Sequence, residues 1–260
     1  MGNIAKVERP NICILRTLLA VTEQVKRTHD SFFHFFPGSM QKLSPFIPSR
    51  RFPPVEECDD DGFLAMGGDL SPETLLDAYS HGIFPWPIHE FAPMPWWSPD
   101  PRGILELDRV HFSRRLLRTC RSNKFSVSLN ANFSQVIRKC AMFHDSTWIT
   151  RQMIDGYTRL HEAGFAHSVE AWHEGQLVGG VYGVAIRGLF AAESMFHTMT
   201  DASKVALVFL VNRLRQQDFR LLDIQMVTAH TKQFGAVEIS RDEYLLRLDK
   251  ALAQNCDFSP

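Results

Sequence analysis

The stretch AHSVEAWHEGQLVGGVYGVAIRGLFAAESMF, residues 166–196, decides the fold. It divides into three runs rich in β-branched, aromatic and small apolar residues, separated by the turn sequences HEGQ and RG. Runs of this length bounded by glycine-containing turns are typical of strands joined by hairpins. The stretch therefore predicts a three-stranded antiparallel meander.

The pattern after the meander alternates between helix and strand. Asp201 is placed to cap a helix with the sequence ASKVALVFLVNRLRQQ, and RLLDIQM at 220–226 reads as a further strand. Ser240 and Glu243 form a capping-box pattern that opens a C-terminal helix ending near residue 253. A helix crossing over between two strands is typical of an α/β domain, here of the acyltransferase type.

The segment before the meander predicts helices at about 112–122, 133–142 and 150–163. Thr150 is placed to start the last of these helices and Gly164 to stop it.

A shorter helix is predicted closer to the N-terminus, with Ser71 as its cap, Pro72 at its first position and Gly82 after its end. The stretch 83–102 that follows holds six prolines, too many for a regular element.

We expect a domain boundary near residue 100. Residues 1–44 then form a poorly ordered extension, 45–100 a small N-terminal domain, and 101–260 a larger domain. At 260 residues and 45% hydrophobic, the chain is long enough to give each domain a core.

The charge is unevenly distributed. A net charge of −1 argues against nucleic-acid binding over the whole surface, yet residues 102–139 hold nine basic residues against two acidic ones. Such a segment fits either a phosphate backbone or a solvated, salt-bridged face. The basic residues that form its helical core are Arg114, Arg115, Arg118, Arg121 and Lys124.

The five cysteines are scattered and show no C-x-x-C spacing, so neither a disulfide framework nor a zinc site is indicated. This usage suits a reducing compartment. The apolar run ICILRTLLAV at 12–21 is too short to span a bilayer. We therefore expect a cytoplasmic protein that does not enter a membrane.

Glu193 is a carboxylate in an otherwise apolar strand. Burying an unpaired carboxylate costs several kcal/mol or shifts its pKa, so this residue is paired, partly wet or functional. Asp223 and Gln225 lie two positions apart in the predicted strand and should point to the same side. Composition and spacing fit either a structural hydrogen-bond network or an active site for these three residues. The standard G-x-S-x-G, P-loop, G-x-G-x-x-G and HExxH motifs are all absent from the sequence.

On its motifs the sequence resembles the leucyl/phenylalanyl-tRNA–protein transferase family. The longest matching motif is GFLAMGGDLSPETLLDAYSHGIFPW at 62–86. The others are WWSPDPRG (96–103), TWITRQM (147–153), GFAHSVEAW (164–172), LVGGVYGV (177–184), ESMF (193–196), ASK (202–204) and LLDIQ (221–225).

The resemblance implies an enzyme that takes leucine or phenylalanine, and methionine weakly, from its charged tRNA. It joins that amino acid to the N-terminal Arg or Lys of a protein, which marks the product for N-end rule degradation. It also implies a small N-terminal α/β domain followed by a larger domain with a GNAT-like (N-acetyltransferase-like) fold. The site is expected in the cleft between the two domains, and the protein is expected to be a monomer. Neither a cofactor nor a metal is implied, because an aminoacyl ester is already activated.

The resemblance also assigns site residues. It places Glu193, Asp223 and Gln225 at the polar centre. We expect Asp223, acting through Gln225, to orient and help deprotonate the amine, and Glu193 to hold the acceptor's positive end or the peptide backbone. Aromatic positions associated with the 3′-terminal adenosine and the site entrance fall on Tyr79, Trp86, Trp148 and Tyr157. The pocket for the amino-acid side chain falls on Val181, Phe190, Ala192, Met195, Leu210 and Leu222. The basic helix would contact tRNA phosphates.

Three departures from the family pattern bear on selectivity. Ala192 replaces a usual glycine, and Val181 and Leu210 stand where methionine or phenylalanine is common, so the preference between leucine and phenylalanine stays open. Three rival functions also stay open. They are an acyl-CoA-dependent N-acetyltransferase, for which the sequence lacks an Arg/Gln-x-x-Gly-x-Gly loop, a peptidoglycan-directed aminoacyltransferase, and an inactive tRNA-binding module.

Overall fold

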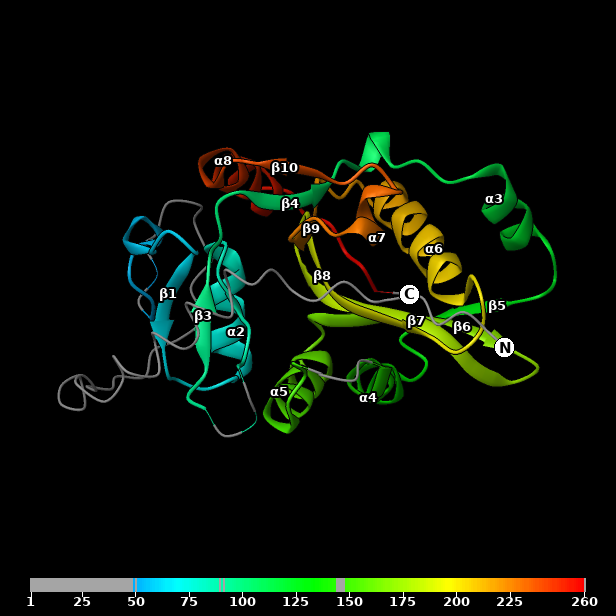
Figure 1. Ribbon diagram of the computed structural model, residues 1–260, viewed down its shortest axis with the longest axis horizontal. Coiled ribbons are helices and arrows are strands. Elements are labelled where there is room, and N and C mark those ends of the chain that lie inside the picture. The colour runs from blue at the N-terminus through cyan, green and yellow to red at the C-terminus, as the bar shows by residue number, and fades with distance from the viewer. Residues whose placement is uncertain (1–48, 50, 89, 91, 144–147, 260) are drawn as a thin grey trace, which may run out of the picture. The chain divides into compact units, whose positions relative to one another are not determined.

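The computed structural model describes residues 49, 51–88, 90, 92–143 and 148–259, all within one compact unit (Figure 1). The predicted N-terminal extension at 1–44 and the expected start of order near 45 lie outside these residues. None of the described helices is long and apolar enough to cross a membrane.

A small antiparallel sheet of order β1-β3-β2 comes first along the chain. Its strands are β1 (Phe63–Met66), β2 (Phe84–Pro85) and β3 (Pro95–Trp97). The expectation that 83–102 holds no regular element is therefore wrong. Two of its six prolines lie in these strands, at positions that sheets tolerate, because Pro95 begins its strand and Pro85 ends a strand at the sheet edge.

Helix α2 (Pro72–Ser80) lies between β1 and β2, as predicted. The Ser71 hydroxyl accepts a hydrogen bond from the Thr74 N–H, and Pro72 occupies the first turn. Gly82 follows the helix with a φ of +77°, a left-handed conformation that favours glycine.

The larger sheet has seven strands in the order β10-β4-β9-β8-β7-β6-β5. The predicted meander is confirmed, because β6 (Ala166–His173), β7 (Gln176–Ile186) and β8 (Leu189–His197) pair antiparallel. The predicted crossover is also confirmed, because helix α6 (Ala202–Gln216) returns the chain to β9 (Leu221–Gln225), which pairs parallel to β8. Mixed strands and helices place the fold in the predicted α/β class.

Short elements complete the larger sheet and were not predicted. They are the strands β4 (Arg102–Leu105), β5 (Ser126–Leu129) and β10 (Val237–Ile239). The one-turn helix α7 (Ala229–Lys232) was not predicted either. The 3-10 turns Val55–Glu57 and Leu107–Arg109 are also short.

The predicted helices form within two residues of their expected ends. They are α3 (Arg114–Arg121), α4 (Phe133–Phe143), α5 (Arg151–Glu162) and α8 (Arg241–Leu252). Thr150 and Ser240 cap α5 and α8 through their hydroxyls. Asp201 occupies the cap position of α6 but makes no side-chain cap hydrogen bond, contrary to prediction. Its φ of +72° departs from the extended backbone in which a cap side chain reaches the next turn.

Helices cover both faces of the larger sheet, with α4 and α5 on one side and α6 on the other (Figure 1). Side-chain alternation along β7 explains this arrangement. Tyr182 and Val184 pack in one apolar cluster with α4 and α5, whereas Val181 and Ala185 pack in another with α6.

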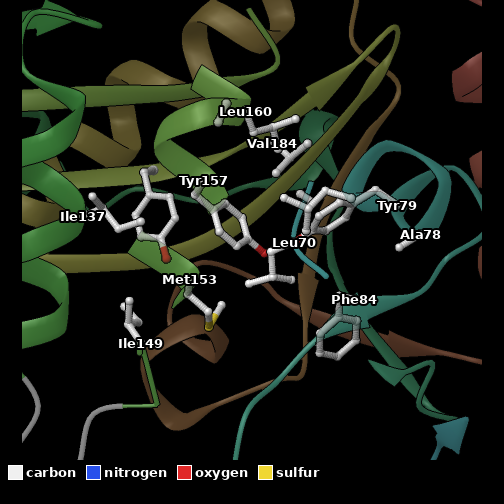
Figure 2. Packing of buried hydrophobic residues seen from close by; sticks show 14 of the residues in the cluster. Leu70, Ala78, Tyr79, Phe84, Ile137, Ile149, Met153, Tyr157, Leu160 and Val184 are labelled. Carbon is white, nitrogen blue, oxygen red and sulfur yellow. The ribbon is translucent and has the colours of Figure 1, made fainter. Parts of the chain in front are cut away.

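The cluster on the α4 and α5 face extends into the small sheet. Figure 2 shows Tyr79 and Phe84 near Tyr157 and Val184, and all four are buried in one core. The chain leaves the small sheet at Trp97 and enters the larger one at Arg102. Both sheets share this core, and the division into two domains near residue 100 stays a prediction.

Candidate active site

Glu193 lies on a β-bulge in β8. Tyr182 of β7 pairs with Ser194 and Gly183 pairs with Ala192, so Glu193 has no residue opposite it. A bulge bends its strand and redirects the side chain of the extra residue. Here the redirected side chain is the carboxylate that the sequence marked as unusual.

Three side chains from three elements donate hydrogen bonds to the Glu193 carboxylate. The Tyr79 hydroxyl of α2 lies 2.6 Å from Oε1, and the Tyr157 hydroxyl of α5 lies 3.2 Å from Oε2. The Gln225 Nε2 of β9 lies 3.3 Å from Oε1. The two tyrosine hydroxyls also contact each other, and Figure 2 shows their rings side by side. The small sheet's helix and the larger sheet thus meet at one carboxylate.

Burial raises the pKa of Glu193 to about 7, despite the hydrogen bonds from Tyr79 and Tyr157 that lower it. Burial, together with the charge of Glu193, also raises the pKa of both tyrosines well above the usual value, so both remain donors. Glu193 as a whole residue is partly exposed, while its carboxyl group is surrounded by these three donors. A carboxyl group with this pKa can gain and lose a proton near neutral pH.

Asp223 has a different environment, because it is fully buried against Arg102. The Arg102 Nε lies 2.9 Å from Oδ1 and its Nη2 lies 2.7 Å from Oδ2. The Tyr244 hydroxyl donates to Oδ2 at 2.9 Å, and the Gln225 backbone N–H donates to Oδ1 at 2.9 Å. Each oxygen of Asp223 therefore accepts two hydrogen bonds.

Gln225 ends β9 in a γ-turn. Its φ is +55°, and the Met226 N–H donates to the Ile224 carbonyl at 2.6 Å. A γ-turn with a positive φ at its central residue is rare and strained. Strained residues of this kind cluster at functional sites.

Gly103 of β4 pairs with Gln225, and the next residue, Ile104, pairs with Asp223. A Cβ at Gly103 would lie 2.6 Å from the Met226 carbonyl carbon, so the turn can approach β4 only beside a glycine. The side-chain alternation from which Asp223 and Gln225 were expected to point to the same side therefore does not hold at this end of β9. Asp223 contacts Arg102 and Tyr244, whereas the Gln225 side chain contacts Glu193.

The structure brings together the three polar residues singled out in the sequence, and Gln225 connects the other two. Its backbone contacts Asp223 and its side chain contacts Glu193. The catalytic roles assigned to the three residues stay predictions.

The six residues predicted to line the amino-acid pocket belong to one apolar cluster on the α6 face. Four are fully buried and two are partly exposed at its edge. The buried residues are Val181, Phe190, Leu210 and Leu222, and the partly exposed ones are Ala192 and Met195. Ala192 precedes Glu193 in β8, so this cluster adjoins the polar centre.

The four aromatic residues assigned to the adenosine and the site entrance fall into two groups. Trp86 and Trp148 are partly exposed and pack against the core, with Trp86 also edge-on to Trp97 at 6.3 Å between ring centroids. Tyr79 and Tyr157 are at most 1% exposed. Their rings therefore have no free face for a base, and their hydroxyls serve Glu193 instead.

The basic residues on and after α3 are exposed. Among the described residues, none lies within 4.0 Å of an acidic group as an ion pair. These residues are Arg114, Arg115, Arg118, Arg121 and Lys124. Within the described parts of the chain, these five residues therefore form a solvated cationic surface.

Arg102 and Tyr244 were missed as contributors to this site. A signal was present, because an Asp in an apolar strand needs a cationic or multiply hydrogen-bonded partner when buried. The sequence does not show which of its many arginines provides that partner. Within the described parts of the chain, no group of three or more His, Cys, Asp or Glu is arranged to hold a metal ion.

Comparison with known proteins identifies the family. The chain matches the sequence profile of the leucyl/phenylalanyl-tRNA protein transferase N-terminal domain over residues 68–100. It matches the profile of the leucyl/phenylalanyl-tRNA protein transferase over residues 104–249.

Named relatives cover most of the chain. A leucyl/phenylalanyl-tRNA–protein transferase from Solidesulfovibrio magneticus is 53% identical over 204 residues, which is 77% of this chain and 82% of that protein. The protein of the same name from Stutzerimonas stutzeri is 50% identical over 211 residues, which is 79% of this chain and 91% of that protein.

Solved structures are much less similar. A ribosomal-protein-alanine N-acetyltransferase from Brucella melitensis biovar Abortus 2308 is 12% identical, with a TM-score of 0.31 over 42% of this chain and 84% of that one. L-PGS from Bacillus licheniformis is 10% identical, with a TM-score of 0.36 over 70% of this chain and 71% of that one. Scores this low support no inference about this protein. The two profile matches and the identity to named relatives, in contrast, show that the chain belongs to the leucyl/phenylalanyl-tRNA–protein transferase family.

Proposed function

We propose that this protein transfers leucine or phenylalanine, and methionine weakly, from aminoacyl-tRNA to the N-terminal Arg or Lys of acceptor proteins. Besides family membership, the observation that carries the proposal is the Glu193 carboxyl group, which is hydrogen-bonded to Tyr79, Tyr157 and Gln225 and has a pKa of about 7. The product would be marked for N-end rule degradation. We place the reaction in the cytoplasm and assign it to a monomer.

The reaction exchanges an ester for an amide. The acceptor's α-amine nitrogen attacks the carbonyl carbon of the aminoacyl ester, forming a C–N bond and breaking the C–O bond to the tRNA ribose. The leaving ribose oxygen keeps the electron pair and takes up a proton, which balances the proton lost by the amine. An activated ester requires no ATP, so alignment of amine and carbonyl supplies much of the rate.

Proton removal is the step at which Glu193 acts in this proposal. An α-amine has a pKa of about 7.7–8.0 and is largely protonated at neutral pH. Glu193, with a pKa of about 7, holds the ammonium group as a carboxylate and accepts its proton over a small pKa difference. The Gln225 Nε2, which donates to the Glu193 Oε1 at 3.3 Å, orients the carboxylate toward the ammonium group.

Asp223 contributes indirectly. Both of its oxygens are already committed to Arg102, Tyr244 and the Gln225 N–H, so it has no free position for an amine. Its role in the proposal is to hold Gln225. This differs from the expectation drawn from the sequence, in which Asp223 helped to deprotonate the amine and Glu193 only held the acceptor.

Selection of the donor amino acid is assigned to the apolar cluster beside Glu193. One methylene group in an apolar pocket discriminates by only about 1–3 kcal/mol, which accounts for the expected leakage to methionine. The Ala192 methyl group adds volume at the exposed edge of this cluster.

The tRNA is assigned to two surfaces. The exposed cations of α3 would contact acceptor-stem phosphates, which position the tRNA without reading its sequence. Trp86 and Trp148 would stack on the 3′-terminal adenosine, since stacking on an aromatic ring is worth about 1–3 kcal/mol for any base.

The test supplies radiolabelled leucine and phenylalanine separately on tRNA to peptides that begin with Arg, Lys, Asp or Ala. We expect incorporation only into the Arg and Lys peptides. Label on the Asp peptide would be consistent with the proposed donor, aminoacyl-tRNA, and would refute the proposed restriction of the acceptor to N-terminal Arg or Lys. Incorporation from acetyl-CoA, or tRNA binding with no transfer to any peptide, would refute the proposed activity.

A further inference from the structure

Arg102 makes contacts from every nitrogen of its guanidinium while only 1% exposed. Nε and Nη2 donate to Asp223, and Nη1 donates to the Gly82 carbonyl at 2.9 Å. Its central carbon lies 4.7 Å from the Phe84 ring centroid and 4.3 Å from the Tyr244 ring centroid. A planar fork of this kind cannot be replaced by a lysine ammonium.

These contacts join three parts of the molecule. Gly82 follows α2, and Phe84 lies in β2 of the small sheet. Asp223 lies in β9, and Tyr244 lies in α8. Arg102 itself begins β4, the strand that pairs with β9. The position of Asp223 is therefore fixed by elements on each side of it.

Asp223 in turn holds the strained turn at Gln225. Its Oδ1 accepts the Gln225 N–H, the amide of the residue with a φ of +55°. Such a conformation is unfavourable and persists only where surrounding contacts impose it. Without a fixed acceptor at Oδ1, Gln225 is free to relax, and its carboxamide then moves away from Glu193.

We propose that Arg102 and Tyr244 are positioning residues for aminoacyl transfer, holding Asp223 so that the γ-turn directs the Gln225 carboxamide at Glu193. This inference rests on the proposed function. Neither residue is hydrogen-bonded to Glu193 in the described structure, although the Arg102 charge lowers the pKa of Glu193. The positioning role proposed for both residues is exerted through Asp223. Their loss is expected to lower kcat while leaving KM for aminoacyl-tRNA unchanged, because neither belongs to the apolar cluster or the basic helix.

Two single variants give graded tests. Tyr244→Phe keeps the ring over Arg102 and removes only the hydroxyl, so we expect kcat to fall about tenfold. Arg102→Lys keeps the charge and removes the fork, and we expect kcat to fall about a hundredfold, as for a displaced catalytic group. An unchanged kcat in folded Tyr244→Phe and Arg102→Lys would overturn the proposal.

Arg241→Met is the matched control. Arg241 of α8 also donates to a carbonyl near the small sheet, that of Ser98 at 2.8 Å, but it makes no contact with Asp223. The proposal predicts a wild-type kcat for this variant. A fall equal to that of Arg102→Lys would mean that any arginine joining these elements matters, which refutes a specific role through Asp223.

The double variant Arg102→Met/Asp223→Leu separates positioning from stability. Replacing a buried ion pair with apolar residues is often neutral or stabilising, so we expect a folded protein by circular dichroism and thermal melting. We also expect kcat to fall about a hundredfold and the Gln225 amide to exchange hydrogen faster than in the wild type. A folded double variant with wild-type kcat, or with unchanged exchange at Gln225, would overturn the inference.

Amide exchange also separates the two proposals. If the wild type transfers no amino acid, the proposed function falls, while faster exchange at Gln225 in the double variant still supports the positioning role. If the wild type transfers and exchange is unchanged, the positioning role alone falls.

Discussion

The neighbouring strands β8 and β9 each carry one site carboxylate, and the two carboxylates have opposite environments. Asp223 is completely buried and accepts four hydrogen bonds, two of them from Arg102. Glu193 is partly accessible, accepts its hydrogen bonds from neutral donors and has a pKa of about 7. Two carboxyl groups whose surroundings differ in this way serve different purposes in one site. We interpret Asp223 as the fixed member and Glu193 as the titrating one.

Removing the charge of the fixed carboxylate should have the largest effect. Asp223→Asn leaves Arg102 buried without a counter-ion, and breaking a buried pair from one side costs about 3–5 kcal/mol. We expect a large fall in the free energy of unfolding, measured by urea denaturation, together with loss of transfer. A stable, active Asp223→Asn variant would remove the distinction between the two carboxylates.

The titrating carboxylate should affect rate more than stability. Glu193→Gln keeps a group that the tyrosine hydroxyls can hydrogen-bond and removes the proton acceptor, so kcat should fall by about 10²–10⁴. Single-turnover transfer measures this. A single-turnover rate within a few-fold of the wild-type rate would contradict our account.

The same variant should change how stability depends on pH. The folded pKa of Glu193, about 7, lies above the unfolded value of about 4.3. Its contribution to stability is therefore fully present below pH ~4.3 and is lost as pH rises through the folded pKa. Thermal melts across this range should show a decline from pH ~5 to ~7.5 in the wild type that is reduced in Glu193→Gln.

The basic helix should affect binding alone. Replacing Arg114 and Arg118 with Ala removes two exposed cations from α3, and the slope of log K for tRNA binding against log salt should fall by roughly one for each phosphate that the helix no longer neutralises. Filter binding at several salt concentrations checks this, with an alanine replacement of the exposed Arg220 as control. An unchanged slope would exclude α3 from the tRNA interface.

The smallest effect is expected at the edge of the apolar cluster. Ala192→Gly removes one methyl group beside Glu193, so the kcat/KM ratio of phenylalanine to leucine should rise by up to about tenfold. Competition between the two charged tRNAs measures the ratio. A ratio that does not change would show that this methyl group lies outside the pocket.

Long periodic elements were the predictable part of this fold. The meander and the helices α3 to α6 were correct because the hydrophobic period and the bounding turns agree locally in each of them. The strands β1 to β5 and β10 were missed because each is four residues or shorter and forms only by pairing with other segments of the chain.

The site was predictable in its members and not in its geometry. Glu193, Asp223 and Gln225 were conspicuous because polar groups in apolar strands need a reason. The bulge at Glu193 and the γ-turn at Gln225 depend on register and backbone conformation, which alternation does not reveal. Arg102 meets Asp223 across 121 positions of sequence, a pairing that only the fold establishes.

The most direct test of the account is the pH dependence of single-turnover transfer to an Arg-initiated peptide by the wild type and by Glu193→Gln. We predict that the wild-type rate rises with pH through about 7, the pKa of Glu193. In the variant this rise should move to about 7.7–8.0, because the amine must then lose its proton without Glu193. A rise at the same pH in both proteins would contradict the claim that Glu193 accepts the proton.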